Sequence, residues 1–205
     1  MRKDVSSTVR NKIILIGGPS GSGKTHFGKE LSREISAAYL DKDTASRHFT
    51  ERILEILGSH KHDRESDIYR GEVRDLEYGV MIKTALENLA LGHDVVCTAP
   101  FLKEFTDEFW VEEMRVEAEL LDAQCLFIWI HTDERTARQR LIYRAANRDN
   151  EKLSNWDKYI KSLGIMPPRG CDELIPVDNT SSSSASLLEQ VHGIVELMKQ
   201  RDRNA

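Results

Sequence analysis

Eight consecutive residues carry the clearest chemical pattern in this chain. The run Gly18-Pro19-Ser20-Gly21-Ser22-Gly23-Lys24-Thr25 fits G-x-x-x-x-G-K-[ST], the phosphate-binding P-loop. Its glycines let the backbone curl so that N–H groups face phosphate oxygens, while the lysine reaches the β- and γ-phosphates and the threonine hydroxyl binds Mg²⁺. The pattern predicts a nucleoside triphosphate site, with Lys24 also catalytic and Thr25 on the metal, made of Gly18, Ser20, Gly21, Ser22, Gly23, Lys24 and Thr25.

Two carboxylates follow the next predicted strand. Asp43 is the predicted catalytic base, because a carboxylate there can accept the proton of a substrate hydroxyl. Asp41 is the alternative candidate for the base and is also predicted to lie beside the substrate. It could instead hold Mg²⁺ through a water molecule. Either residue could instead cap the helix that begins near Thr44. Arg47, one turn further on, is predicted to contact an anionic substrate group or else to be solvated.

A second basic constellation lies further along the chain. Arg140, Arg144 and Arg148 are spaced i, i+4, i+8, so on one continuous helix they share a face. Arginine clamps phosphoryl oxygens bidentately, and this segment follows an apolar strand from which it can arch over the phosphate loop as a lid. Arg140 and Arg144 are predicted to be catalytic, and Arg140 also to contact the nucleotide.

The acceptor side is predicted from weaker signals. Arg70, Arg74 and Tyr78 lie at i, i+4, i+8 on a predicted helix, where they form either a polar wall for a substrate or a solvated face. Phe101 comes just after Pro100 at the end of a predicted strand and is expected to line a substrate pocket. Arg74 and Phe101 are therefore added to the predicted substrate residues.

Short apolar runs alternate with longer amphipathic ones along almost the whole chain. Strands are predicted at 12–17, 37–40, 94–98, 125–130 and 174–177. Helices are predicted at 24–36, 44–57, 67–91, 104–122, 133–147, 152–163 and 184–201. Such alternation predicts an α/β fold with a parallel sheet covered on both faces, in which ligands bind beyond the carboxyl ends of the strands.

Composition excludes several classes of protein. The chain has 205 residues, of which 40% are hydrophobic and 31% charged, as in a globular domain. A net charge of −5 makes nucleic acid an unlikely partner, and no run reaches the ~18 apolar residues of a membrane span. The three cysteines are far apart, and no apolar segment follows the first residues, so reduced thiols and a cytoplasmic location are expected.

Together these segments resemble AAA_33-type P-loop kinases. The resemblance rests on the phosphate loop, on Leu40–Thr44, and on Arg140-Leu141-x-x-Arg144…Arg148-Asp149 followed by Trp156 and Tyr159. This group is similar to gluconate kinases, chloramphenicol phosphotransferases and zeta-toxin kinases. The resemblance covers residues 12 to 180 and implies a single domain over 1–205 with a P-loop NTPase fold, a five-stranded parallel sheet and an arginine-bearing helical lid at about 135–163.

The same resemblance implies a reaction and further contacts. It implies ATP-dependent phosphorylation of a hydroxyl group with Mg²⁺, and Asn179 and Thr180 match the loop that borders adenine. One departure is that strand 94–98 ends in Thr98, where many P-loop proteins carry a Walker B carboxylate. This argues against an ATPase motor, and the absence of Asn-Lys-x-Asp argues against a GTPase switch.

The prediction is a phosphotransferase that moves the γ-phosphate of ATP to a hydroxyl of a sugar acid, a nucleoside-like compound or an antibiotic. One alternative is a nucleoside monophosphate or polynucleotide 5′-kinase. A polynucleotide fits poorly with the acidic charge balance, and a monophosphate acceptor calls for an arginine pocket near Arg47, Arg70 and Arg74. The missing Walker B acid leaves a second alternative, a non-catalytic ATP-binding regulatory module.

Overall fold

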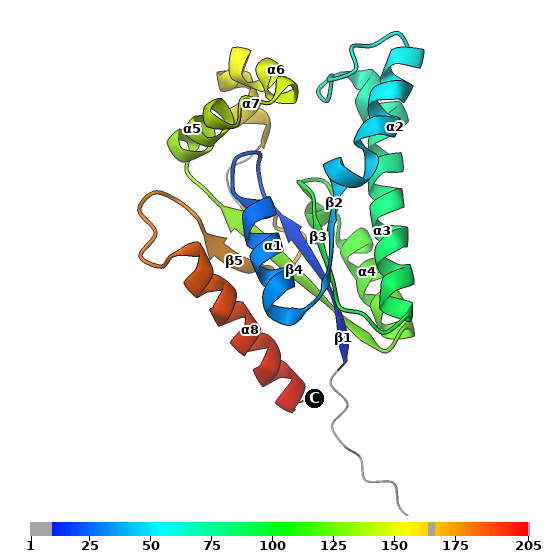
Figure 1. Cartoon of the computed structure of the whole chain (residues 1–205), viewed down its shortest axis with the longest axis vertical. Coiled ribbons are helices and arrows are strands. Elements are labelled where there is room, and N and C mark those ends of the chain that lie inside the picture. The colour runs from blue at the N-terminus through cyan, green and yellow to red at the C-terminus, as the bar shows by residue number, and fades with distance from the viewer. Residues whose placement is uncertain (1–9, 164–166, 205) are drawn as a thin grey trace, which may run out of the picture.

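A parallel sheet forms the centre of the computed structural model, which describes residues 10–163 and 167–204 (Figure 1). Within these residues the sheet has five strands in the order β2-β3-β1-β4-β5. The strands are β1 (Asn11–Gly17), β2 (Ala38–Asp41), β3 (Val95–Thr98), β4 (Ala123–His131) and β5 (Ile175–Asp178). Each pair of neighbouring strands in this order is parallel, which confirms the α/β fold with a five-stranded parallel sheet.

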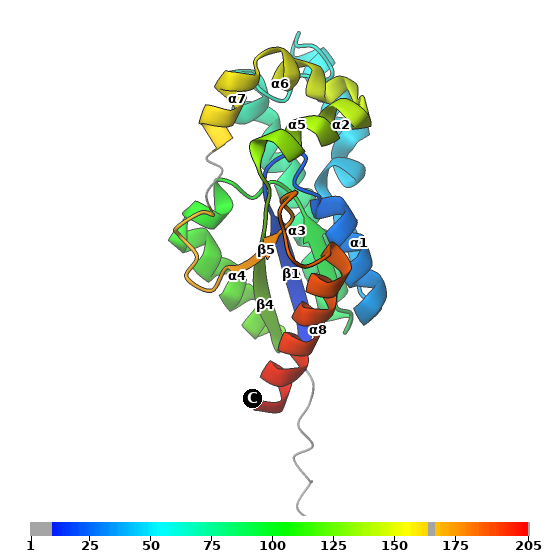
Figure 2. The ribbon, with the colours of Figure 1, turned by 90° about the vertical axis from the view of Figure 1, so that its left-hand side faces the viewer.

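Helices cover both faces of this sheet. Helices α1 (Lys24–Ile35) and α8 (Leu187–Asn204) pack on one face, and α3 (Arg74–Ala90) and α4 (Glu108–Leu120) on the other (Figure 2). Strand β1 is apolar on both sides, so Ile14 and Ile16 join one buried cluster and Ile13 and Leu15 the other. None of the described helices is long and apolar enough to cross a membrane.

A group of short helices sits beyond the carboxyl end of the sheet (Figure 1). It consists of α5 (Glu134–Arg144), the 3₁₀ turn η3 (Asn147–Asp149), α6 (Asn150–Ser154) and α7 (Trp156–Leu163), and we call it the lid. Leu141, Trp156 and Tyr159 form a small apolar cluster of its own, and the Trp156 indole donates a hydrogen bond to Glu134 Oε1 at 2.8 Å. The lid therefore has internal packing that holds its helices together.

Several helix boundaries differ from those predicted by periodicity. The predicted helix 133–147 ends at Arg144, because Ala145 adopts a left-handed conformation with φ of 48°. The predicted helix 67–91 contains a π-helical turn, η1 (Tyr69–Val73), directly before α3. The predicted helix 104–122 divides into the 3₁₀ turn η2 (Glu104–Thr106) and α4, whose first N–H groups are capped by the Asp107 carboxylate.

The helix after β2 begins earlier than predicted. Helix α2 (Lys42–Ile56) starts directly after Asp41, whose side chain caps it by accepting a hydrogen bond from the Thr44 N–H. Asp41 thus fulfils the capping alternative, and Asp43 lies inside the first turn with its carboxylate not used as the cap. This early start places Lys42 on the buried side of α2.

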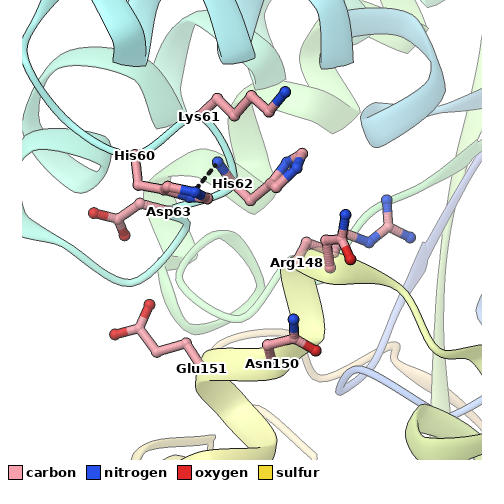
Figure 3. A pocket seen from close by; sticks show the side chains of 8 residues that line it. His60, Lys61, His62, Asp63, Arg148, Asn150 and Glu151 are labelled. Atoms are coloured by element: carbon pink, nitrogen blue, oxygen red, sulfur yellow. Dashed lines mark hydrogen bonds between the residues drawn. The ribbon is translucent and has the colours of Figure 1, made fainter.

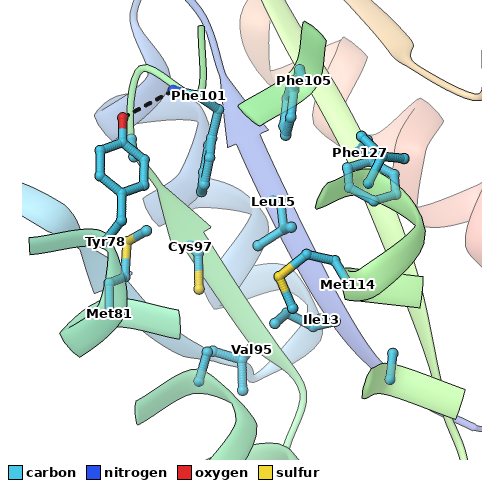
Figure 4. Close-up of a cluster of buried hydrophobic side chains, with 14 of the residues drawn as sticks. Ile13, Leu15, Tyr78, Met81, Val95, Cys97, Phe101, Phe105, Met114 and Phe127 are labelled. Atoms are coloured by element: carbon cyan, nitrogen blue, oxygen red, sulfur yellow. Dashed lines mark hydrogen bonds between the residues drawn. The ribbon is translucent and has the colours of Figure 1, made fainter. Parts of the chain in front are cut away.

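The prediction that Phe101 lines a substrate pocket is wrong. Its side chain is 0% exposed and lies in the apolar cluster between the sheet and helices α3 and α4 (Figure 4). The ring stacks on Phe105 with centroids 5.0 Å apart, and the Phe101 N–H donates to the Tyr78 hydroxyl at 3.3 Å. Burying a large aromatic ring contributes favourable free energy to folding, so Phe101 stabilises the core. A short sequence pattern does not show this burial.

Candidate active site

The phosphate loop lies between β1 and α1, as the sequence predicts. Gly23 precedes α1 with φ of 97°, a conformation that side chains with a Cβ rarely adopt. Gly21 has φ of 81°, and a Cβ there would lie 2.7 Å from the Ala137 carbonyl oxygen of the lid. The glycines therefore give the loop its shape and also let the lid backbone approach it closely.

The ammonium of Lys24 lies against the first residues of this loop. Its Nζ donates hydrogen bonds to the carbonyl oxygens of Gly18 and Pro19, both at 2.7 Å. Burial lowers the pKa of Lys24 to about 7, although the nearby Asp43 carboxylate acts in the opposite direction. An anion bound at the loop would favour the charged form of Lys24, so phosphate binding and protonation of this lysine support each other.

Arg140 braces the loop from the lid. Its guanidinium donates to the carbonyl oxygens of Gly21 at 3.2 Å and Ser22 at 3.4 Å, and to Asn179 Oδ1 at 3.2 Å. The Asn179 amide in turn donates to the Ser22 carbonyl oxygen at 2.7 Å. Thr180 instead bonds within its own loop, to Asp178 and Ser182. Arg140 and Asn179 thus meet at the phosphate loop, while contacts of Asn179 and Thr180 with adenine remain a prediction.

Arg144 and Arg148 do not lie on one continuous helix, contrary to the sequence prediction, because α5 ends at Arg144. Arg144 is held by Asp149, which is 0% exposed and accepts a hydrogen bond from Arg144 Nε at 2.8 Å. Arg148 comes from η3, after the helix has ended, and its Nη1 lies 3.0 Å from Asp43 Oδ2. The left-handed turn at Ala145 therefore directs Arg148 across the site to the predicted base.

Asp43 lies between two cations. Its Oδ1 is 3.1 Å from Lys42 Nζ, and its Oδ2 contacts Arg148. Burial by itself raises the pKa of Asp43, but the charges of Lys42 and Arg148 outweigh it and hold that pKa well below its usual range. Asp43 is therefore ionised at neutral pH and can only accept hydrogen bonds.

Asp41 lies beside Thr98, the residue that ends β3 where many P-loop proteins carry a Walker B carboxylate. Strands β2 and β3 pair Asp41 with Thr98, and the Thr98 hydroxyl donates to Asp41 Oδ2 at 3.0 Å. Asp41 and Thr25 both line the cavity described below and offer hard oxygen ligands. The described residues contain no group of three or more His, Cys, Asp or Glu arranged to hold a metal ion. This donor set fits Mg²⁺, which is commonly held by one or two carboxylates together with substrate phosphates.

A buried polar cluster contacts Asp43 through Lys42. Lys42 and Glu77 form an ion pair with side chains only 5% and 2% exposed, and Glu77 also accepts hydrogen bonds from Thr50 at 2.6 Å and Tyr69 at 2.6 Å. Sequence reasoning missed this cluster. The available signal was Glu77 itself, a carboxylate on the otherwise apolar face of α3 between Val73 and Met81.

These groups surround one large cavity of about 1090 Å³. It is bounded by the phosphate loop, α2, α3 and the lid. Among the described residues, twelve lysines and arginines line it: Lys24, Lys29, Lys42, Arg64, Arg70, Arg74, Lys103, Arg140, Arg144, Arg148, Lys152 and Lys158. Only four carboxylates do so: Asp41, Asp43, Glu65 and Asp75. In a chain with a net charge of −5, this local excess of cations favours anionic ligands.

The predicted acceptor residues are only partly brought together. Arg74 lines the cavity, but it is held by a bidentate pair with Glu104 at 2.7 and 2.9 Å, a partner that sequence reasoning missed. Arg70 also lines the cavity, with a side chain 58% exposed. Arg47 is exposed on α2 and is not among the described residues of the lining. The arginine pocket required for a monophosphate acceptor is therefore not assembled from these three.

A smaller cavity of about 560 Å³ lies between residues 60–63 and the lid (Figure 3). His60 and His62 line it, and the His62 N–H donates to His60 Nδ1 at 3.3 Å. Arg148 borders both cavities. The two cavities are therefore adjacent where the lid meets this loop.

Comparison with known proteins places this geometry in a family. The model of the AAA_33 family, described as an AAA domain, matches residues 13–164. A guanylate kinase from Wolinella succinogenes is 43% identical over 53 residues, which are 26% of this chain and 24% of that protein. The chain thus spans about a quarter of the length of the curated relative that it matches.

Solved structures show the same fold over nearly the whole chain. A protein from Chloroflexus aurantiacus, provisionally named a kinase, matches with a TM-score of 0.62 at 20% identity, over 91% of this chain and 98% of that one. A gluconokinase from Sinorhizobium meliloti gives a TM-score of 0.57 at 20% identity, over 96% and 95%. A shikimate kinase from Bacteroides thetaiotaomicron gives 0.50 at 16% identity, over 91% and 98%. The fold is therefore that of P-loop kinases.

Proposed function

The chain belongs to the AAA_33 family, and from this premise we propose that it transfers the γ-phosphoryl group of ATP to a hydroxyl group of a small molecule. One observation supports this most directly. The Lys24 ammonium at the phosphate loop and the Asp43 carboxylate line the same cavity, close enough for the charge of Asp43 to act on the pKa of Lys24. A cation for the phosphates and an acceptor for a hydroxyl proton therefore lie at one site.

The side chains divide the work of such a reaction. The P-loop amides and Lys24 hold the phosphates, and Arg144 offsets charge that develops on the transferred group. Thr25 with Asp41 would hold Mg²⁺, which supplies further charge neutralisation and geometry when bound. Asp43 orients the acceptor hydroxyl, and because its pKa is so low it takes the proton only late, as the new bond to phosphorus makes that hydroxyl acidic.

The lining of the cavity supports an acidic acceptor among the classes considered. A sugar acid carries a carboxylate that can pair with the excess of lysine and arginine side chains. A neutral nucleoside or antibiotic brings no such charge, although Lys42, Arg74 and Arg144 already have carboxylate partners. The gluconokinase that shares this fold acts, by its name, on a compound of the favoured class, and we extend that class to this chain as part of the proposal.

The alternatives receive less support from the described residues. A nucleoside monophosphate kinase is suggested by the short guanylate kinase match, but Arg47 lies outside the cavity lining and Arg74 is held by Glu104. A regulatory module needs no acceptor site, whereas here the cavity at the phosphate loop is also lined by Asp43, Pro100 and Lys103.

Single-turnover transfer of labelled γ-phosphate to pooled sugar acids, sugars, nucleosides, aminoglycosides and phenicols tests the proposal. We expect transfer to a sugar acid, and Asp43→Asn to slow it by about 10²–10⁴-fold while ATP affinity stays within about twofold. Asp172→Asn, at an exposed carboxylate that is not among the described residues lining the cavity, is the matched control. Wild-type transfer by Asp43→Asn would refute the base assignment. ATP binding without transfer to any compound would favour the regulatory module.

A further inference from the structure

Lys152 is a buried cation of the lid with no role in the site as described so far. It lies in α6, which Figure 1 places above the phosphate loop, and it lines the main cavity. Its side chain is only 11% exposed. A lysine is rarely buried to this extent without a close carboxylate partner, so the groups around Lys152 indicate which ligand it could pair with.

The contacts of Lys152 are all loose. Its Nζ donates a hydrogen bond of 3.4 Å to Ser20 Oγ of the phosphate loop. Two carboxylates are more distant, Glu65 at 3.8 Å and Asp149 at 3.9 Å, and the ring centroid of Tyr159 is 5.7 Å away. An ammonium has three donors, and among the described residues these contacts satisfy them poorly. An anion entering this space would be a better partner than any of them.

The position of Lys24 shows where the terminal phosphate would lie. Its Nζ donates to the carbonyl oxygens of Gly18 and Pro19, so the ammonium that reaches the β- and γ-phosphates in this motif lies against the first residues of the loop. Ser20 is the next residue, and Lys152 approaches it from the lid. The two lysines therefore face the same end of the triphosphate from the loop and from the lid.

Electrostatics agree with this placement. Burial lowers the pKa of Lys152, while Glu65, Asp149 and Asp43 partly oppose that effect. Arg144 lowers the pKa of both Lys152 and Lys24, and Asp43 raises both. Lys24, Asp43, Arg144 and Lys152 all line the same cavity, so charge on one of them acts on the others.

We propose that Lys152 is a further catalytic residue, which contacts the terminal phosphoryl group of the nucleotide from the lid during transfer. The inference rests on the proposed function. In that reaction the acceptor oxygen bonds to the γ-phosphorus, the bond to the β–γ bridging oxygen breaks with its electron pair left on the diphosphate, and the acceptor proton passes to Asp43. Lys152 forms no covalent bond and stabilises the charge on the equatorial oxygens.

A first experiment reads this contact without any acceptor. Calorimetry in the presence of Mg²⁺ compares the binding of ADP and of the β,γ-imido analogue of ATP to wild type, to Lys152→Met and to the control Lys161→Met, an exposed lysine of α7 outside the cavity. For Lys152→Met we expect analogue affinity to fall by about 10- to 100-fold, with ADP affinity unchanged within about twofold. An equal loss for both nucleotides, or no loss for either, would overturn the inference.

A second experiment reads the catalytic step. With an accepted hydroxyl compound, Lys152→Met should lower the single-turnover rate by about 10²-fold, and Lys152→Arg should restore part of it. Because Lys152 acts protonated and its pKa is lowered, the wild-type rate should decline as pH rises, and this decline should move to higher pH in Lys152→Arg. A purely structural lysine would not move that limb.

The two proposals fail in distinguishable ways. If the wild type transfers phosphate, and Lys152→Met has the same nucleotide affinities and transfer rate as Lys161→Met, the role of Lys152 is refuted and the kinase assignment stands. If the wild type transfers phosphate to no compound, the kinase assignment fails, while calorimetry still decides whether Lys152 contacts the terminal phosphate. Lys152→Gln replaces Lys152→Met if the latter has a lowered melting temperature.

Discussion

The two ends of the main cavity are built in different ways. The core of the nucleotide end is one continuous segment, Gly18–Thr25, whose backbone and Lys24 match the phosphate-binding motif, and Arg140 and Lys152 of the lid contact it. The acceptor end consists of side chains fixed by partners far away in sequence, such as Lys42 with Glu77, 35 residues apart, and Arg74 with Glu104, 30 residues apart. The proposed phosphate contacts are thus encoded locally, while the proposed acceptor side depends on how distant segments pack.

The two ends also treat their lysines differently. Burial lowers the pKa of Lys24 to about 7. Burial acts in the same direction on Lys42, but the carboxylates of Asp43 and Glu77 outweigh it and raise the pKa of Lys42. Binding of an anion would therefore stabilise the charged form of Lys24. Lys42 is already paired with Asp43 and Glu77 and holds Asp43 in place.

The largest effect is expected at the nucleotide end. Lys24→Ala should lower phosphoryl transfer by about 10³-fold or more, because a cation on the transferred group is worth that order of rate. Lys161→Ala is the control, since that lysine is exposed outside the cavity. Rapid-quench kinetics measures the rate. Transfer within tenfold of wild type would break the distinction between the two ends.

Phe101→Ala tests the corrected place of that ring behind the acceptor end. Deleting a fully buried phenylalanine should cost about 3–5 kcal/mol of unfolding free energy, measured by urea denaturation. The KM for the acceptor should stay within about twofold in conditions where the variant is folded. Unchanged stability with a raised acceptor KM would instead restore Phe101 to a pocket.

Glu77→Gln should separate the ends in a single variant. Lys42 would lose its buried carboxylate, at a cost of about 1–3 kcal/mol in unfolding free energy. We expect the KM for the acceptor to rise and ATP affinity to stay unchanged, because Glu77 supports Asp43 through Lys42 and does not contact the phosphate loop. The exposed Glu87→Gln on the same helix is the control. A selective loss of ATP affinity would contradict this separation.

The smallest effect sharpens the contrast between the two lysines. Lys24 has a lowered pKa of about 7, so in the free protein it is charged below that pH and largely neutral at pH 8. Phosphate binding restores its charge, and ATP binding at pH 8 should take up about one proton, with less uptake at pH 6. Calorimetry in buffers of different ionisation enthalpy measures this uptake. Equal uptake at both pH values would exclude a titrating Lys24.

Much of the candidate active site could be predicted from local sequence patterns. Where those predictions are wrong, the error has a physical cause. The P-loop, Asp41 and Asp43 follow predicted strands and lie at the cavity. Arg148 was assigned to a continuous helical face, but the helix ends at Arg144, and such an end depends on one backbone conformation at Ala145. Periodicity does not register a single left-handed residue of this kind.

The sequence by itself determined the phosphate loop and the alternation of strands and helices, because both arise from the conformational preferences and apolar spacing of neighbouring residues. The burial of Phe101, the pairing of Arg74 with Glu104, and the contacts of Arg148 with Asp43 and of Lys152 with Ser20 became visible once the chain was folded. Those outcomes depend on packing between segments distant in the chain, and no local pattern specifies the energy of such contacts.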